Sequence, residues 1–253
     1  MISALLIGRK GSLGFLRKNT YPILGKPLAY YPMRAAKEAQ LVDGVFLSTD
    51  DERLMELAKK EGISIIKRPQ YLCTKKALGE DAFVHGFKEI VKRKGEQELI
   101  VLLHCNSATV TSQMIDEGIA ALRKNPSLDS AVSVSKYNMW SPLRARRIGQ
   151  DGLLHPFVPF EIFGDPSKIT CDRDSQGDVY FADMGLSIVR PRCLEHIEEG
   201  LLPQKWMGRK IYPLIQEAGC DVDYEFQFSQ TEYWLKEFGH NGLSLKKKVR
   251  RHS

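Results

Sequence analysis

A glycine-rich basic loop follows the first apolar run of this 253-residue sequence and contains residue types that bind phosphate. The loop reads Gly8-Arg9-Lys10-Gly11-Ser12-Leu13-Gly14-Phe15-Leu16-Arg17-Lys18-Asn19. Glycine backbone N–H groups approach phosphate oxygens closely, a guanidinium bonds two oxygens, and a lysine supplies a point charge. The spacing fits neither G-x-x-x-x-G-K-[ST] nor G-x-G-x-x-G. The loop therefore predicts a polyphosphate site outside those two motif classes, with a solvated basic turn as the alternative.

A pair of carboxylates stands near the other end of the sequence. Asp221 and Asp223 lie two residues apart, so their side chains point the same way in an extended segment. Two carboxylates on one side can hold Mg²⁺ and help deprotonate a hydroxyl group. The alternative is a solvated turn after Gly219. Together with the basic loop, the pair favours metal-assisted chemistry on a phosphate.

The elements that must position these residues alternate between apolar strands and amphipathic helices. Strands are predicted at 2–7, 45–48, 64–67, 99–104, 130–134 and 179–189. Helices are predicted at 27–39, 51–60, 79–93, 111–123 and 230–238. Such alternation predicts an α/β fold with a mostly parallel sheet, whose ligands bind outside the carboxyl ends of the strands. The alternation of Tyr224, Phe226 and Phe228 predicts a strand face or a core contact.

The sequence predicts a single domain over 1–245. Its proline- and glycine-rich part, 137–190, is predicted to be an inserted arm or lid that contacts a partner subunit. The formal net charge is +6, of which the basic tail 246–253 supplies five, so the body is close to neutral. A nucleic-acid groove is therefore not expected, and binding through the tail alone is the alternative.

Cysteine usage and hydropathy bear on the compartment. The five cysteines are odd in number and form no C-x-x-C pair, which favours reduced thiols in a cytoplasmic protein over a disulfide framework or a zinc site. No apolar run approaches the roughly 20 residues that span a bilayer. We therefore expect a cytoplasmic protein with no membrane partner.

The opening motif R-x-G-S-x-G-x-x-x-K-N, followed by Leu24-Gly25-Lys26-Pro27-Leu28, resembles the start of the acylneuraminate (CMP-sialic acid) cytidylyltransferase family. The likeness continues in order through 45–51, 67–72, 79–87, 101–108 and 221–223. It implies a three-layer Rossmann-like nucleotidyltransferase domain with a mostly parallel sheet. It also implies that CTP and an acidic 2-keto sugar give a CMP-sugar and pyrophosphate, with Mg²⁺, in the cytoplasm. Family members are usually homodimers in which the partner's arm closes the sugar site.

The resemblance also assigns roles to individual residues. Those implied to be catalytic are Arg9, Lys18, Asp221 and Asp223, and the implied metal ligands are Asp221 and Asp223. Those implied to bind the nucleotide are Gly11, Ser12, Gly14, Asn19, Arg68 and Gly79. Those predicted to bind the acceptor are His104, Asn106, Ser107 and Arg173. His104 is predicted from its place at the carboxyl end of a strand, with a packed or solvated histidine as the alternative.

The sequence departs from the family pattern mainly on the acceptor side. Leu13 stands where the family has a lysine, and Asp183 stands where it has a neutral residue. The segment from His104 to Val110 differs from the family's Q-P-T-S-P-L-R. We therefore expect an altered acceptor: another nonulosonic acid, a 2-keto sugar acid such as Kdo, or a phosphonate. A non-catalytic nucleotide- or sugar-binding module is a further alternative. So is a sugar-nucleotide-dependent glycosyltransferase, because Asp-x-Asp binds metal–diphosphate there as well.

Overall fold

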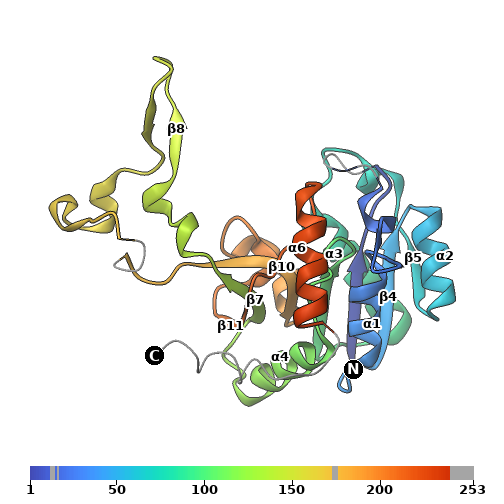
Figure 1. The fold of residues 1–253 in the computed structure, drawn as a ribbon. Coiled ribbons are helices and arrows are strands. Elements are labelled where there is room, and N and C mark those ends of the chain that lie inside the picture. The colour runs from blue at the N-terminus through green and yellow to red at the C-terminus, as the bar shows by residue number, and fades with distance from the viewer. Residues whose placement is uncertain (12–14, 16, 173–175, 240–253) are drawn as a thin grey trace.

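The apolar runs form a central sheet in the computed structural model, which describes residues 1–11, 15, 17–172 and 176–239 (Figure 1). Within those residues the sheet has seven strands in the order β11-β7-β10-β6-β1-β4-β5. They are β1 (Ile2–Ile7), β4 (Gly44–Thr49), β5 (Ser64–Lys67), β6 (Leu99–His104), β7 (Ser130–Lys136), β10 (Tyr180–Val189) and β11 (Ile211–Gln216). β10 runs antiparallel to β6 and β7, whereas the other neighbouring pairs are parallel. The sheet is therefore mostly parallel, as predicted.

Helices cover both faces of the sheet. They are α1 (Tyr30–Glu38), α2 (Glu52–Lys60), α3 (Gly79–Lys94), α4 (Ser112–Lys124), α5 (Arg192–Glu195) and α6 (Phe226–Glu237). α1, α2 and α4 pack on one face, and α3 and α5 pack on the other. No helix within the described residues is long and apolar enough to cross a membrane.

Side-chain alternation along β1 explains the three layers. Ala4 and Leu6 join the core beneath α1 and α4, whereas Leu5 and Ile7 join the core beneath α3. All four are buried, as expected for a parallel strand that is covered on both faces. The predicted three-layer α/β architecture is therefore confirmed.

Two helices begin at residues other than those predicted from the apolar spacing. The helix predicted at 27–39 begins only at Tyr30, because Pro27 belongs to β3 (Lys26–Pro27), which pairs with β2 (Pro22–Ile23). The helix predicted at 230–238 begins earlier, at Phe226. α6 packs Phe228 and Trp234 into a third apolar cluster beside α1. This cluster fixes the end of the chain segment that carries the two predicted metal ligands.

Residues 137–172 leave the sheet and project away from it (Figure 1). Near its tip, β8 (Arg146–Ile148) and β9 (Leu154–Pro156) form a two-stranded hairpin. β10 then returns the chain to the sheet. The projecting segment carries many large apolar side chains in exposed positions: Met139, Trp140, Ile148, Leu153, Leu154, Phe157, Ile162 and Phe163. It therefore has the composition of an interaction arm.

Candidate nucleotide-binding site

A pocket of about 570 Å³ opens where β1 and β6 end side by side. Both strands run in the same direction, so Gly8 and Arg9 after β1 emerge beside His104 at the end of β6. The pocket is lined by Ile7, Gly8, Arg9, Lys18, Asn19, Arg68, Leu72, Ala77, Leu78, Gly79, His104, Asn106, Asp221, Asp223 and Tyr224. Most of the residues predicted from the sequence therefore meet in one cavity.

The loop after β1 begins with a close approach to the core. A Cβ at Gly8 would lie 2.8 Å from Cys105 Sγ and 2.7 Å from Leu54 Cδ1, so only glycine fits there. The next residue, Arg9, donates from its guanidinium to the carbonyl of Thr74. Gly11 has a φ of 79° and does not line the pocket. Ser12, Leu13 and Gly14 lie outside the described residues.

Lys18 and Asn19 enter the pocket from the end of this loop. The Lys18 ammonium forms an ion pair with Asp223. Asn19 is only 8% exposed, and its backbone carbonyl accepts from Ala29 N at 2.9 Å. Its Oδ1 is buried without a hydrogen-bond partner among the described residues. A ligand hydroxyl or amine that donates to this oxygen would remove a desolvation cost of about 1–3 kcal/mol.

Arg68 supplies a buried cation to the pocket wall. It follows β5, is 6% exposed, and donates from Nη2 to Ser48 O at 2.7 Å. Its pKa is lowered, chiefly by burial. Gly79 lines the same wall at the first turn of α3. A buried guanidinium bonded to a neutral carbonyl retains positive potential for an incoming anion or carbonyl oxygen.

An acidic pair also borders the pocket. Asp221 and Asp223 both line the pocket, as the two-residue spacing suggested. Burial raises the pKa of Asp221, and the charge of Asp223 raises it further, while Lys18 and a hydrogen bond from Asn106 act in the opposite direction. A carboxyl group in this state favours a nearby cation, because a cation relieves both the burial cost and the repulsion.

Asn106 holds the acidic segment in place. Its Nδ2 donates to Asp221 Oδ2 at 3.2 Å and to Val222 O at 3.1 Å. Its backbone carbonyl accepts from Val222 N at 2.9 Å. Asn106 therefore lies in the pocket, but its amide is engaged by the acidic segment. Binding of the acceptor by Asn106 stays a prediction.

The structure places the other predicted acceptor-binding residues differently. The His104 ring packs edge-on against Phe83 and borders the pocket, and burial lowers the pKa of His104 to about 4. Ser107 is fully buried, donates to Met184 O at 2.9 Å and does not line the pocket. Arg173 lies outside the described residues. Of these three residues, His104 is the one that the structure places on the pocket wall.

Two sequence expectations about nearby residues are wrong. Asp183 does not face the pocket; it is 6% exposed and lies among the strands of the sheet. Tyr224 and Phe226 lie neither on a strand face nor in the core, since they are 64% and 68% exposed and stack on each other with centroids 6.1 Å apart. Phe228 is buried, as expected of a core contact.

Some residues of the site carry no chemical signal in the sequence. Leu72, Ala77, Leu78 and Tyr224 line the pocket, although apolar side chains in turns resemble ordinary surface loops. Gln227 positions the start of α6, because its Oε1 accepts from the backbone N–H groups of Asp223 and Tyr224, each at 2.7 Å. A glutamine four residues after an Asp-x-Asp pair is the signal that could have identified this cap.

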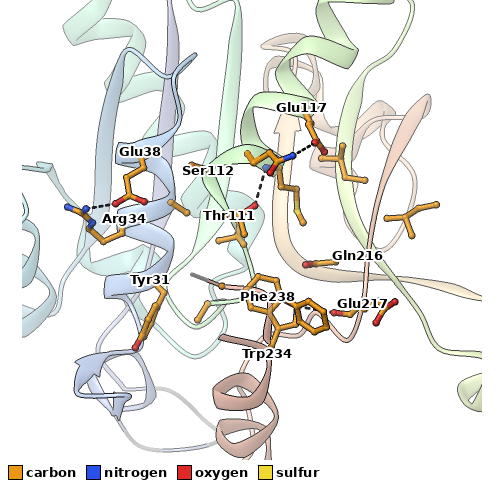
Figure 2. Close-up of a pocket in the computed structure, with 18 of the residues that line it drawn as sticks. Tyr31, Arg34, Glu38, Thr111, Ser112, Glu117, Gln216, Glu217, Trp234 and Phe238 are labelled. Atoms are coloured by element: carbon orange, nitrogen blue, oxygen red, sulfur yellow. Dashed lines mark hydrogen bonds and ion pairs between the residues drawn. The ribbon is translucent and has the colours of Figure 1, made fainter. Parts of the chain in front are cut away.

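A larger cavity of about 1020 Å³ lies elsewhere, between α1, α4, β11 and α6 (Figure 2). Its lining includes Tyr31, Thr111, Gln216, Trp234 and Phe238, which Figure 2 labels. The cavity mixes aromatic rings with paired charges and contains none of the predicted site residues. The smaller pocket, which holds the predicted residues, is therefore the candidate chemical site.

The donor set of the smaller pocket fits a magnesium nucleotide. Arg9 and Lys18 supply cations for phosphate oxygens. Asp221 and Asp223 supply the one or two carboxylates with which Mg²⁺ is usually held beside substrate phosphates. Among the described residues no cluster of three or more metal-binding side chains occurs.

Comparison with known proteins supports the same assignment. The family described as cytidylyltransferase matches residues 4–146, more than half of the chain. The N-acylneuraminate cytidylyltransferase of Oncorhynchus mykiss is 24% identical over 249 residues, covering 98% of this chain and 54% of that protein. The Escherichia coli O18:K1:H7 enzyme of the same name is 28% identical over 137 residues, covering 54% and 32%. The chain thus spans about half or less of the length of these curated relatives.

Solved structures show the same fold. A CMP:2-keto-3-deoxy-manno-octonic acid synthetase complexed with CTP superposes with a TM-score of 0.64 at 15% identity, covering 93% of this chain and 98% of that one. Its low identity makes it evidence for the fold alone. The family match and the alignment over 98% of this chain confirm the resemblance found in the opening loop. The chain belongs to the cytidylyltransferase family, as a divergent relative of the N-acylneuraminate cytidylyltransferases.

Proposed function

We propose that this protein transfers CMP from CTP to an acidic sugar and releases pyrophosphate. The observation that carries the proposal is the convergence of Lys18, Arg68 and the Asp221–Asp223 pair in one pocket. Basic and acidic side chains that line one pocket suit a substrate of bound metal and triphosphate. The curated relatives named above support the nucleotide and the acidic-sugar class.

In this proposal the basic side chains bind the triphosphate. Arg9 and Lys18 neutralise the phosphate oxygens, so that negative charge can build up on the leaving pyrophosphate. Asn19 and Arg68 would hold the ribose and base, since the buried Asn19 Oδ1 needs a donor and Arg68 presents a buried cation. A Cβ at Gly79, in the first turn of α3, would lie in ordinary contact with Ile7 Cδ1 at 3.8 Å.

The acidic pair, Asp221 and Asp223, would hold Mg²⁺. When bound, the metal supplies positive charge beside the phosphate and favours ionisation of the acceptor hydroxyl. Metal binding by Asp223 would weaken its ion pair with Lys18, so that the ammonium could bind a phosphate oxygen. Asp221 accepts from Asn106 throughout, so its orientation is set before any ligand arrives.

The acceptor is proposed to bind beside His104. A neutral imidazole can accept a hydrogen bond from a sugar hydroxyl or donate one to its carboxylate. The acceptor class is a nonulosonic acid or a related 2-keto sugar acid such as Kdo. His104 replaces the glutamine of the family pattern, so the acceptor preference is expected to differ from that of typical relatives.

The assembly is proposed to be a homodimer formed through the projecting arm, 137–172. Its exposed apolar side chains exceed what a solvated hairpin needs, and a second copy is the simplest cover for them. We place the reaction in the cytoplasm, in keeping with five cysteines that are all free in the structure.

The test is pyrophosphate release with CTP and Mg²⁺ over a panel of 2-keto sugar acids and phosphonates. Wild type is compared with Asp221→Asn and with Glu56→Gln, a control on the exposed side of α2. We expect release with one acid, its loss in Asp221→Asn and its retention in Glu56→Gln. CTP binding without release on any acid would contradict the proposal and favour a non-catalytic binding module. Release of a nucleoside diphosphate from a sugar nucleotide would instead favour a glycosyltransferase.

A further inference from the structure

The carboxyl group of Asp183 lies buried where β7, β10 and β11 meet the chain segment that leads to Asp221 and Asp223. Its side chain is 6% exposed and its two oxygens receive four neutral donors. We propose that Asp183 is a positioning residue that fixes the segment 219–223, and thereby the placement of both acidic side chains. The inference rests on the proposed function, which assigns those side chains to the metal.

The four donors divide into two pairs. Oδ1 accepts from Ser133 Oγ at 2.5 Å and from Gly185 N at 3.1 Å, both of which stay within β7 and β10. Oδ2 accepts from Ser135 Oγ at 2.7 Å and from Gln216 Nε2 at 2.8 Å. These two residues connect the carboxyl group to the acidic segment. One oxygen therefore anchors the carboxyl group in the sheet, and the other faces the segment to be placed.

Ser135 makes the shorter connection. Its hydroxyl donates to Asp183 and accepts from Gly219 N at 2.9 Å. Gly219 packs so tightly that a Cβ there would lie 2.5 Å from Asp183 Oδ2 and 2.3 Å from Gln216 Nε2. The residue before it, Ala218, has a φ of 52°, in the left-handed region that alanine avoids. Contacts from outside the segment must therefore hold this turn in place.

Gln216 makes the second connection. Its Nε2 donates to Asp183 Oδ2 and to Thr109 O, at 2.8 and 3.1 Å. The Thr109 hydroxyl in turn accepts from Cys220 N at 3.0 Å and donates to Cys220 O at 3.1 Å. Two hydrogen-bonded routes thus run from one carboxyl group to the two residues that precede Asp221.

This arrangement explains why an acidic residue occupies position 183. Each oxygen accepts two hydrogen bonds, and an asparagine would replace one acceptor with a donor. That donor would then face two other donors in a buried site, which is unfavourable. The departure from the family's neutral residue therefore concerns the acidic segment of the site and not the acceptor.

The decisive comparison is Ser135→Ala with Ser133→Ala. Both changes remove a hydroxyl that bonds the same carboxyl group from the same strand. Ser133, however, accepts from Leu186 N in β10 at 2.9 Å, whereas Ser135 accepts from Gly219 N. Backbone hydrogen exchange is measured on both variants at matched distance from their unfolding midpoints. If Ser135→Ala does not fold, Gln216→Met interrupts the second route and is measured instead.

We expect Ser135→Ala to accelerate exchange at Gly219 and Cys220 about fivefold, the effect of one net hydrogen bond. Ser133→Ala is expected to leave exchange at these residues as in wild type. Asp183→Asn should accelerate exchange at both 186 and 219. Equal exchange at 219–222 in the two serine variants would overturn the inference.

A second experiment tests whether the placement of the acidic side chains affects metal binding. CTP binding is titrated with and without Mg²⁺, and the tightening by Mg²⁺ should be about fivefold smaller in Ser135→Ala than in Ser133→Ala. Equal tightening in both variants would overturn the link between Asp183 and the metal. A wild type that binds no CTP would count against the proposed function alone, because the exchange experiment still decides the positioning.

Discussion

Lys18 forms an ion pair with Asp223 across the pocket, although 205 positions separate the two residues in the sequence. The lysine is 12% exposed and the aspartate 50% exposed. The pair joins the basic loop after β1 to the acidic segment before α6. It also keeps the two opposite charges of the site in place before any substrate arrives.

Replacing Lys18 with methionine should weaken CTP binding. A charge-assisted hydrogen bond contributes about 1.5–3 kcal/mol, so the dissociation constant should rise roughly 10- to 100-fold. Lys10→Met is the matched control, because Lys10 shares the loop and its side chain does not line the pocket. Calorimetric titration at physiological ionic strength measures both. Similar losses in the two variants would mean that the loop acts only through its overall charge.

Asp221→Asn should stabilise the protein near neutral pH while activity falls by about 100-fold. Burial and repulsion from Asp223 raise the pKa of Asp221 above its ordinary value of 3.8, so the ionised group destabilises the folded state. As pH rises through the interval between the unfolded and folded pKa values, wild type should lose stability relative to the variant. Above the folded pKa the difference should stay constant.

Thermal unfolding of both proteins between about pH 3.5 and 8 measures this relation. The sign is opposite to that of an ordinary salt-bridged aspartate, whose lowered pKa would make wild type gain stability over the same interval. A variant that is less stable than wild type at pH 7 would contradict the burial argument. Added Mg²⁺ and CTP should reduce the difference, because they bind the ionised form.

His104→Gln should change the acceptor and leave the nucleotide site alone. We expect kcat/KM for the natural acceptor to fall roughly 10- to 100-fold, with the CTP dissociation constant within about twofold of wild type. Because burial lowers the pKa of His104 to about 4, its ring is neutral throughout the physiological range. A wild-type inflection near pH 6.5 that disappears in His104→Gln would show instead that the ring titrates during turnover.

Ile148→Asp should separate the proposed dimer. Ile148 is 75% exposed at the hairpin of the projecting arm, and a charge there would be buried by a second copy. The dimer dissociation constant should rise roughly tenfold or more, as measured by analytical ultracentrifugation. Ile215→Asp, on the edge strand β11 and 57% exposed, is the matched control. Monomers in both wild type and variant would assign the arm to a different partner.

Much of the fold was accessible from hydrophobic patterns because buried parallel strands leave a strong signal. β5 and β6 occupy the residues that the pattern predicted, 64–67 and 99–104. β11 was missed because Pro213 interrupts its apolar run, and proline is tolerated there only at the edge of the sheet. The start of α6 was missed because Phe226, in its first turn, is exposed and does not continue the apolar spacing of the helix.

The residues of the site also differ in how well the sequence could predict them. Charged residues in short, dense motifs, such as Arg9 and Lys18, could be identified because their clustering exceeds what a surface turn needs. Asp183 could not be assigned from the sequence, because a single acidic residue in a strand does not say which hydroxyl groups surround it. The contacts of Asn106 could not be assigned for the same reason, since its amide partners lie 115 and 116 positions away.

The separation of Lys18 and Asp223 along the chain has a consequence for synthesis on the ribosome. The strands that carry the basic loop are made first, and domains begin to fold from the N-terminal end as the chain emerges. The acidic pair becomes available only after residue 223 has left the exit tunnel. A nascent chain therefore carries the cations of the loop long before it carries the two carboxylates. Chains that stop before residue 221 would lack both carboxylates that we propose as metal ligands.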